Sequence, residues 1–377
     1  MHSLEIIEGF KVADNIVNVP KDYEPLDKNA VLFLHTLKGG GSQMAVDKLI
    51  PFIKAMGMNV FIVSVEDGFY RQRFMDDYGA VVVIHPDLYI TDSYTSFMRT
   101  AFDFILFNSC CGGLLYYYID TDIKVYWWVH EDMAVFETNA CKQFFAPEII
   151  SDNVFFLTPW KKFAKEFREK YHKDIDILTI GYEKARDEEV EGSQNLEKMF
   201  RFLIPGSYEV RKGFQDALIA ATKLPGFMLD MCQFIFVGYV AEEPLFNKFA
   251  EIAAKLPYIK VLGPVEASEL EKLYRVSDVV VVPSLLDIGP LTAVEALRLG
   301  KCLIISDVTG MSQYITDGED GFKVGAEDVD AIAGCYKVLL TDRDKKDVVA
   351  RNGQALFDRC FSMDVMKADV ERIWGNG

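Results

Sequence analysis

Short runs of apolar residues alternate with longer amphipathic segments along most of the chain. In the first half, runs typical of buried strands occur at residues 31–35, 60–65, 80–84, 104–108 and 125–130. A second series follows at residues 202–205, 234–237, 259–262, 279–283 and 302–305. The segments between them carry apolar residues at helical spacing, as residues 42–56 do, with Ser42 as the expected N-cap. Strands that alternate with helices predict parallel sheets, and hence an α/β protein with two Rossmann-like halves.

The two series are separated by a polar, acidic segment at residues 183–197, which is typical of an exposed linker. A chain of 377 residues also exceeds the size at which one hydrophobic core keeps growing. We therefore expect an N-terminal domain at residues 1–182 and a second domain at residues 183–355. Residues 356–377 include a last helical pattern at residues 363–373, which could pack back on the N-terminal domain.

Composition narrows the class of protein. The 40 Lys and Arg against 57 Asp and Glu give a net charge of -17, which opposes binding to nucleic acid. No apolar run reaches the roughly 18–20 residues of a membrane span, and the N-terminus lacks the pattern of a secretory signal. We therefore expect a cytoplasmic enzyme.

One basic amphipathic stretch, at residues 160–173, admits two interpretations. The interspersed Glu166 and Glu169 favour a solvated helix. The alternative is a weak peripheral contact with a membrane that holds a lipid-linked acceptor.

The sequence offers little support for a metal or a bound cofactor. The seven cysteines include the adjacent Cys110 and Cys111 but form no C-x-x-C pair, and the five histidines are scattered. D-x-D occurs four times, which is expected by chance in so acidic a chain, and no P-loop motif is present. We expect neither a metal nor a cofactor.

Residues 283–306 carry the main chemical motif, PSLLDIGPLTAVEALRLGKCLIIS. The pattern predicts a buried strand, a loop with Gly289 and Pro290, and a helix. Proline suits the first helical turn, so the free N–H groups around Leu291 can face an anion or a sugar oxygen. Asp287 and Glu295 lie about two turns apart, and both can face one cleft.

Pro283, Ser284, Asp287, Glu295, Ala296 and Gly300 match, without gaps, a motif of the retaining family-4 glycosyltransferases, which this chain resembles. The resemblance implies the GT-B fold, in which two Rossmann-like domains face each other across a cleft. It assigns Asp287 to the donor sugar and Glu295 to the nucleotide ribose. Asp287 stands where the family has Glu.

Residues 205–214, PGSYEVRKGF, look like the phosphate-binding stretch of that family. Gly206 and Lys212 fall on its Gly and Lys, which implies that Lys212 neutralises the diphosphate leaving group without a metal. Ser207 stands where the family has Arg, and Arg211 could supply that charge from the same loop. The surface-turn interpretation of a Lys-Gly pair also stays open.

Two further matches lie in the first half. Residues 35–43, HTLKGGGSQ, resemble the family's glycine-rich loop, in which Gly40 and Gly41 allow close approach to the donor. A nicotinamide-binding fingerprint fails on spacing, because Met44 stands where it needs glycine. His130 in WWVHED matches a histidine that contacts the donor sugar, and Glu131 is a weaker candidate. A structural histidine is the alternative.

The resemblance implies a retaining, metal-independent hexosyltransferase that moves a sugar from a nucleotide-sugar donor, which is a substrate, to a glycan or glycolipid acceptor. Asp287, His130 and Lys212 are the predicted catalytic residues. A catalytically weak sugar- or nucleotide-binding partner of another transferase stays open, because Ser207 and Asp287 depart from the family pattern. A sugar-nucleotide epimerase or a phosphorylase on the same fold is a further alternative.

Overall fold

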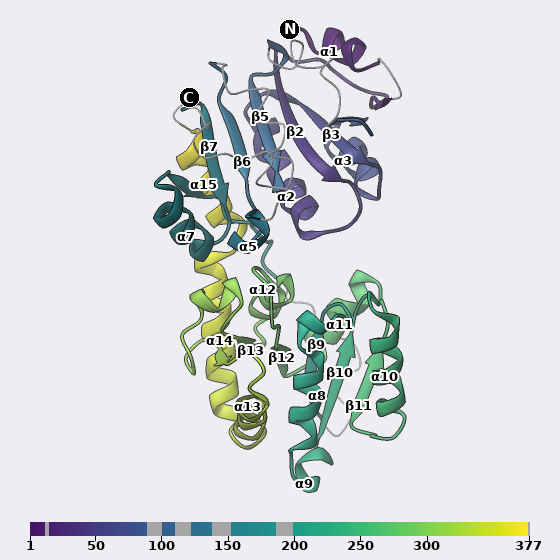
Figure 1. The fold of residues 1–377 in the computed structure, drawn as a ribbon, viewed down its shortest axis with the longest axis vertical. Coiled ribbons are helices and arrows are strands. Elements are labelled where there is room, and N and C mark those ends of the chain that lie inside the picture. Colours follow the sequence, from purple (N-terminus) through teal and green to yellow (C-terminus); the bar gives the residue numbers. More distant parts are fainter. Residues whose placement is uncertain (12–14, 89–99, 110–121, 138–151, 186–198, 376–377) are drawn as a thin grey trace. The chain divides into compact units, whose positions relative to one another are not determined.

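The computed structural model describes residues 1–11, 15–88, 100–109, 122–137, 152–185 and 199–375 (Figure 1). Contacts between residues divide the chain into two compact units. The first unit consists of Met1–Tyr182 together with Met363–Gly377, and the second of Glu183–Ser362. Most of the predicted linker at residues 183–197 lies outside the described residues.

The first unit is built on an eight-stranded sheet with the order β1-β4-β3-β2-β5-β6-β7-β8. All neighbouring strands are parallel except β1, which runs antiparallel to β4. The strands are β1 (Ile16–Asn18), β2 (Lys28–Thr36), β3 (Met58–Glu66), β4 (Val81–Ile84), β5 (Phe104–Asn108), β6 (Val125–Trp128), β7 (Val154–Thr158) and β8 (Ile175–Ile177). The helices are α1 (Ser3–Phe10), α2 (Gly41–Ala55), α3 (Tyr70–Tyr78), α5 (Met133–Phe136), α7 (Lys161–Tyr171) and α15 (Met363–Trp374).

The central strands of this sheet are buried along almost their whole length, which explains their continuous apolar runs. Trp127 and Trp128 of β6 are core residues. Their indole N–H groups donate to backbone carbonyl groups, Trp127 to Ser109 at 2.8 Å and Trp128 to Leu178 at 3.2 Å. Two bulky rings are thereby buried without an unpaired donor.

The second unit holds a six-stranded, fully parallel sheet with the order β11-β10-β9-β12-β13-β14. The strands are β9 (Phe200–Pro205), β10 (Cys232–Val237), β11 (Ile259–Leu262), β12 (Val279–Val282), β13 (Cys302–Ser306) and β14 (Phe322–Val324). The helices are α8 (Phe214–Thr222), α9 (Gly226–Leu229), α10 (Glu243–Ala253), α11 (Ala267–Val276), α12 (Leu291–Arg298), α13 (Val329–Thr341) and α14 (Arg343–Cys360), with 3-10 turns η4 (Val210–Lys212) and η5 (Gly310–Tyr314).

The C-terminal helix α15 packs on the first unit. The Trp374 ring contacts the rings of Phe104 and Tyr126 edge-on, with centroids 5.3 and 5.4 Å apart. Arg372 also donates to the Asp176 carboxylate at 2.6 Å. The second unit extends to Ser362, because α14 continues through residue 355 to Cys360.

The prediction of an α/β protein with two parallel-sheet halves is confirmed, and each predicted apolar run contributes residues to a strand. The pattern missed four strands. Three of them, β1, β8 and β14, lie at a sheet edge and have only three residues each, which give weak apolar runs. The fourth, β7, is an apolar strand next to the edge strand β8 and was simply overlooked. One local prediction is wrong. Helix α2 begins at Gly41 with Gly40 as its N-cap, so Ser42 lies inside the helix and does not cap it.

Candidate functional site

The motif at residues 283–306 forms the predicted strand, loop and helix at the carboxyl end of β12. Pro283 and Ser284 are buried, while Asp287 and Gly289 are partly exposed in the loop. Pro290 is the N-cap residue of α12, one position before the first turn in which the sequence places it, and no side chain among the described residues caps this helix. The N–H groups at its start, including that of the partly exposed Leu291, therefore need a partner from outside the helix.

The structure brings two of the predicted catalytic residues together. The Lys212 ammonium Nζ lies 2.5 Å from Asp287 Oδ2, and the side chains are only 18% and 12% exposed. Lys212 ends the turn η4 after β9, whereas Asp287 lies in the loop after β12, a neighbouring strand. Two adjacent parallel strands thus deliver opposite charges to the same edge of the sheet.

Backbone packing holds the two loops in register. Gly213 has a φ of +68°, and a Cβ added there would lie 1.9 Å from the carbonyl oxygen of Pro283. The Leu285 N–H donates to the Arg211 carbonyl at 2.8 Å. Glycine is required at position 213 for both its conformation and its lack of a side chain, and this contact seats Lys212 next to the loop of Asp287.

A third loop supports Asp287 from the strand beyond β12. The Gly310 N–H donates to the backbone carbonyl of Asp287 at 3.1 Å. A Cβ at Gly310 would lie 2.1 Å from the carbonyl oxygen of Ile288. Gly310 therefore belongs to the candidate site as a support of its backbone, a role that its sequence context did not assign.

The loop after β9 also contains a close backbone approach at Gly206 and a second charge pair. Gly206 follows β9 with a φ of +156°, and its carbonyl oxygen would lie 1.7 Å from a Cβ added at Gly238. The Ser207 hydroxyl donates to Glu209, and Arg211 Nε donates to Glu209 at 2.6 Å. Burial by itself raises the pKa of Glu209, but these hydrogen bonds lower it overall. Arg211, the predicted substitute for the missing arginine, therefore has a carboxylate partner already.

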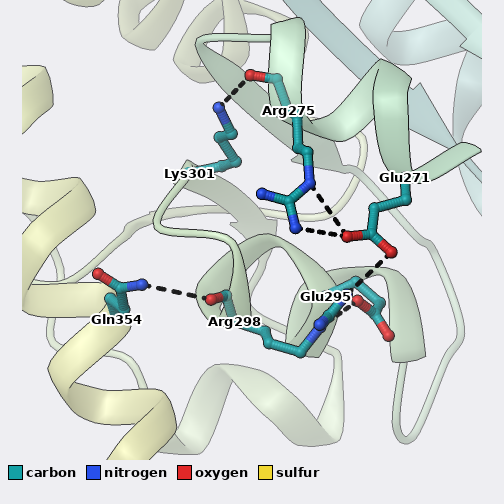
Figure 2. Close-up of polar contacts among 6 residues, drawn as sticks. All are labelled: Glu271, Arg275, Glu295, Arg298, Lys301 and Gln354. Atoms are coloured by element: carbon teal, nitrogen blue, oxygen red, sulfur yellow. Dashed lines mark hydrogen bonds and ion pairs between the residues drawn. The ribbon is translucent and has the colours of Figure 1, made fainter. Parts of the chain in front are cut away.

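The predicted ribose ligand Glu295 lies on α12 within a network of charged side chains (Figure 2). Arg298 Nε donates to Glu295 Oε2 at 2.7 Å. Sequence reasoning missed Arg298, although an acid and a base three residues apart on a predicted helix are expected to meet.

In the first unit, the predicted residue His130 lies with two other polar residues where three neighbouring strands end. His35 lies at the end of β2, Asn108 at the end of β5, and His130 just after β6. His130 Nε2 lies 2.8 Å from Asn108 Oδ1. Asn108 is fully buried, and sequence reasoning missed it, even though it ends a predicted strand as a polar residue.

The orientation of the Asn108 amide determines the tautomer of His130. Asn108 Nδ2 donates to the Ser42 carbonyl at 3.2 Å, so its Oδ1 is the atom that faces His130. Because an amide oxygen only accepts, the proton of neutral His130 must be on Nε2. Nδ1 is then left with an acceptor lone pair.

Burial lowers the pKa of His130 to about 4, with a small further contribution from His35, whereas the charge of Glu131 opposes the shift. Burial also lowers the pKa of His35. His130 is therefore a neutral imidazole at pH 7 and offers a hydrogen-bond acceptor to a ligand hydroxyl.

Glu131 is bound into the same cluster. It accepts a hydrogen bond from the Ser109 hydroxyl, and its Oε2 accepts from the backbone N–H of His130 at 3.0 Å. Ser109 has a φ of 60°, in the left-handed region that few residues other than glycine adopt. These contacts restrain the turn that carries His130.

The glycine-rich loop precedes α2 in the first unit. Gly40 is exposed with an extended backbone, and Gly41 begins the helix. The Gln43 side-chain amide donates to the Thr36 carbonyl at 3.0 Å and closes the loop. As in α12, no side chain of the described residues caps the start of α2.

Other sequence signals have structural explanations. Asp328 and Asp342, from two of the D-x-D pairs, cap α13 and α14. In the described part of the chain, no group of three or more potential metal ligands gathers. The basic stretch forms α7, which buries Phe163, Ala164 and Phe167, so its apolar face is occupied by the core.

Comparison with known proteins shows what the chain is similar to. Residues 185–356, most of the second unit, match the family model described as glycosyl transferases group 1. The fold of the Anabaena protein HepE, solved in complex with UDP-glucose, aligns with a TM-score of 0.74 over 93% of this chain and 100% of that protein, at 15% identity. At such identity the likeness establishes the fold, which is the predicted GT-B fold with two α/β domains.

Two curated relatives are more similar in sequence. An uncharacterised glycosyltransferase of Methanocaldococcus jannaschii is 23% identical over 266 residues, which are 70% of this chain and 65% of that protein. The phosphatidyl-myo-inositol mannosyltransferase of Mycobacterium leprae is 30% identical over 191 residues, or 48% of each chain. The chain thus spans less than two thirds of the length of either relative. No helix among the described residues is long and apolar enough to cross a membrane.

Proposed function

We propose that the chain is a glycosyltransferase that moves a sugar from a nucleotide-sugar donor to a glycan or lipid-linked acceptor, with retention of anomeric configuration and without a metal ion. The observation that carries the proposal is the Lys212–Asp287 pair, which lies within the segment that matches the group 1 family. A cation for a diphosphate and a carboxylate for sugar hydroxyls lie side by side at the carboxyl edge of a parallel sheet. Ligands bind at this edge in open α/β sheets.

In this mechanism Lys212 binds the diphosphate. The bond between the anomeric carbon and the diphosphate oxygen breaks, and the electron pair leaves with that oxygen. The ammonium stabilises the developing negative charge. The acceptor hydroxyl attacks the anomeric carbon from the face that the leaving group vacates, and its proton passes to the departing diphosphate.

The other residues position the donor. Asp287 accepts hydrogen bonds from sugar hydroxyls, while Glu295 accepts a hydrogen bond from a hydroxyl of the nucleotide ribose. The free N–H groups at the start of α12, beside Gly289 and Pro290, suit an anion or a sugar oxygen. In the first unit, the proposed role of neutral His130 is to accept a hydrogen bond from a sugar hydroxyl at Nδ1.

The proposal is tested with a panel of UDP-, GDP-, ADP- and TDP-sugars and a mixture of candidate acceptors. Released nucleotide is measured for the wild-type protein and for the D287N/E295Q double variant. D330N is a matched control, because Asp330 pairs with Lys223 in the same unit at 2.6 Å but is exposed. UDP-sugars come first, since the HepE structure contains UDP-glucose.

We expect release from one donor, its loss in the double variant and its persistence in D330N. NMR of the product's anomeric proton tests retention, and an unchanged rate with a chelator supports metal independence. Correctly folded protein that releases nucleotide from no donor would contradict the proposal. Epimerised donor or phosphate-dependent cleavage would instead identify one of the rival enzymes.

Contact with a membrane is a separate question. Because the apolar face of α7 packs into the first unit, only its exposed, charged face can meet lipid, and the cations there are four lysines and Arg168. The favoured interpretation, a solvated helix, predicts no binding to vesicles with anionic lipid. The alternative, a weak peripheral contact, predicts binding that is lost in 0.5 M salt, because charges at a surface are screened within a few ångströms at high ionic strength. Binding that survives the salt would show an apolar contact.

A further inference from the structure

Glu295 is held in one orientation by a neighbour on its own helix. Arg298 Nε donates to Glu295 Oε2 at 2.7 Å, one turn along α12 (Figure 2). The Arg298 side chain is 14% exposed and that of Glu295 is 31% exposed. A guanidinium presents its N–H groups in a rigid plane, so the largely buried Arg298 imposes a direction on the carboxylate that it binds.

Arg298 is itself restrained from the neighbouring helix α11. One of its terminal nitrogens lies 3.8 Å from Glu271 Oε2. The other oxygen of Glu271 accepts from Arg275, at 3.0 Å from Nε and 2.6 Å from a terminal nitrogen. Figure 2 shows the resulting series, in which carboxylates and guanidiniums alternate from Glu295 to Arg275.

Contacts with the backbone hold the two arginines of this series. Lys301 Nζ donates to the Arg275 carbonyl at 2.6 Å. Gln354 of α14 donates to the Arg298 carbonyl at 3.4 Å, and the Tyr274 hydroxyl joins α11 to α12 through the Thr292 carbonyl at 3.2 Å. An isolated ion pair on a helix surface orders its side chains weakly, but a network with two largely buried guanidiniums orders them more strongly.

The arrangement leaves one oxygen of Glu295 available. Arg298 donates a hydrogen bond to Oε2, whereas none of the described residues donates one to Oε1. A carboxylate only accepts hydrogen bonds, so Oε1 suits a hydroxyl of a ligand. An unrestrained glutamate would instead lose side-chain freedom when it bound that hydroxyl.

We propose that Arg298 is a positioning residue that orients Glu295 so that Oε1 accepts one hydroxyl of the nucleotide ribose, with Glu271 and Arg275 holding Arg298 in place. The proposal rests on the proposed function, because it takes Glu295 as the ribose ligand. Arg298 does not touch the nucleotide, and its effect reaches the ligand only through the Glu295 carboxylate.

The test is a binding measurement by calorimetry on the full chain. The probes are UDP, GDP and ADP, followed by the 2′-deoxy and 3′-deoxy forms of whichever binds the wild-type protein. The variants are R298M, R298K, E271Q, E295Q and R298M/E295Q. R343M is the matched control, since Arg343 is a structural arginine of the same unit that lies over the Phe200 ring at 4.0 Å.

We expect R298M to weaken binding of the ribonucleotide about tenfold while leaving unchanged the binding of the deoxy form that lacks the contacted hydroxyl. The R298M/E295Q variant should bind no more weakly than E295Q. E271Q, which leaves α12 intact, should show a smaller loss of the same kind, and R298K should restore part of the affinity. R343M should not alter the ratio of ribo to deoxy affinity.

The positioning role would be overturned if R298M weakened the binding of the ribo and deoxy nucleotides equally. It would also be overturned if the loss of affinity in R298M/E295Q were the sum of the losses in the two single variants. E271Q and R298K keep the test decisive if R298M does not fold. A wild-type protein that binds no nucleotide would overturn both this inference and the donor site. Binding without sugar transfer would contradict only the transferase, while the comparison of variants would still decide the role of Arg298.

Discussion

Lys212 Nζ and Asp287 Oδ2 lie 2.5 Å apart, although 75 residues separate them in sequence. The predicted ligand of the diphosphate and the predicted ligand of the sugar are therefore ion-paired with each other in this structure. Their neighbours repeat the pattern, because Arg211 is paired with Glu209. An anionic ligand that approaches this loop meets cations that are already balanced by carboxylates.

Removal of the Asp287 charge should separate binding from transfer. In D287N the Lys212 ammonium loses its counter-charge, so we expect free nucleoside diphosphate to bind about three- to tenfold more tightly. Sugar transfer should fall by about a hundredfold or more, because the contact with the sugar is weakened. Calorimetry measures the binding and nucleotide release measures the transfer. Weaker diphosphate binding in D287N would refute the idea that Asp287 competes with the diphosphate for Lys212.

Removal of the Lys212 charge should have the opposite effect on binding. We expect K212M to weaken diphosphate binding and to lower the rate of donor cleavage by about a hundred- to a thousandfold. The control is K223M, which removes the lysine of an exposed pair with Asp330. Equal rates in K212M and the wild-type protein would remove Lys212 from the mechanism.

Gly213 should be intolerant of any side chain. G213A combines a φ of +68° with a Cβ 1.9 Å from the Pro283 carbonyl oxygen, so we expect it to lower the free energy of unfolding by about 2–4 kcal/mol. At Gly334, inside α13, an added Cβ meets nothing within 4 Å. G334A should therefore stabilise the protein by about 0.5–1 kcal/mol. Denaturant unfolding of both variants checks the pair, and a neutral G213A would contradict the close approach of the loops.

His130 should make stability depend on pH. Its pKa is about 4 in the folded protein, below the ordinary 6.5 of an unfolded chain, so the unfolded state binds the proton more tightly. The free energy of unfolding then decreases as pH falls through this window, by about 2 kcal/mol between pH 7 and pH 5. H130Q should lack this part of the pH dependence. If H130Q and the wild-type protein had identical profiles of stability against pH, the lowered pKa of His130 would be contradicted.

The tautomer of His130 gives an independent prediction. In N108D a carboxylate replaces the amide oxygen that accepts from Nε2, and its charge favours the imidazolium. We expect the pKa of His130 to rise from about 4 by at least one unit, as measured by NMR titration of the ring. A pKa that stays the same or falls would show that Asn108 does not face His130.

Much of the fold could be predicted from the sequence because the information is local. Each central strand must be apolar along its length, since helices cover both faces of a parallel sheet, and those runs are visible in the printed residues. The edge strands, such as β1 and β14, were missed because an edge needs only a short and partly apolar segment. Gly213 lies in the motif at residues 205–214, but the carbonyl groups that exclude a side chain at Gly213 and at Gly310 belong to loops distant in sequence.

The candidate site divides in the same way. By itself the sequence determined which residue types are present, the strand ends at which they lie and the i, i+3 spacing that joins Glu295 to Arg298. Only the tertiary structure decided that Lys212 pairs with Asp287, that Arg211 is held by Glu209 and that Asn108 selects the tautomer of His130. The physical reason is that a side chain's partner depends on its direction and on the order of strands in the sheet, and neither is a property of the local sequence.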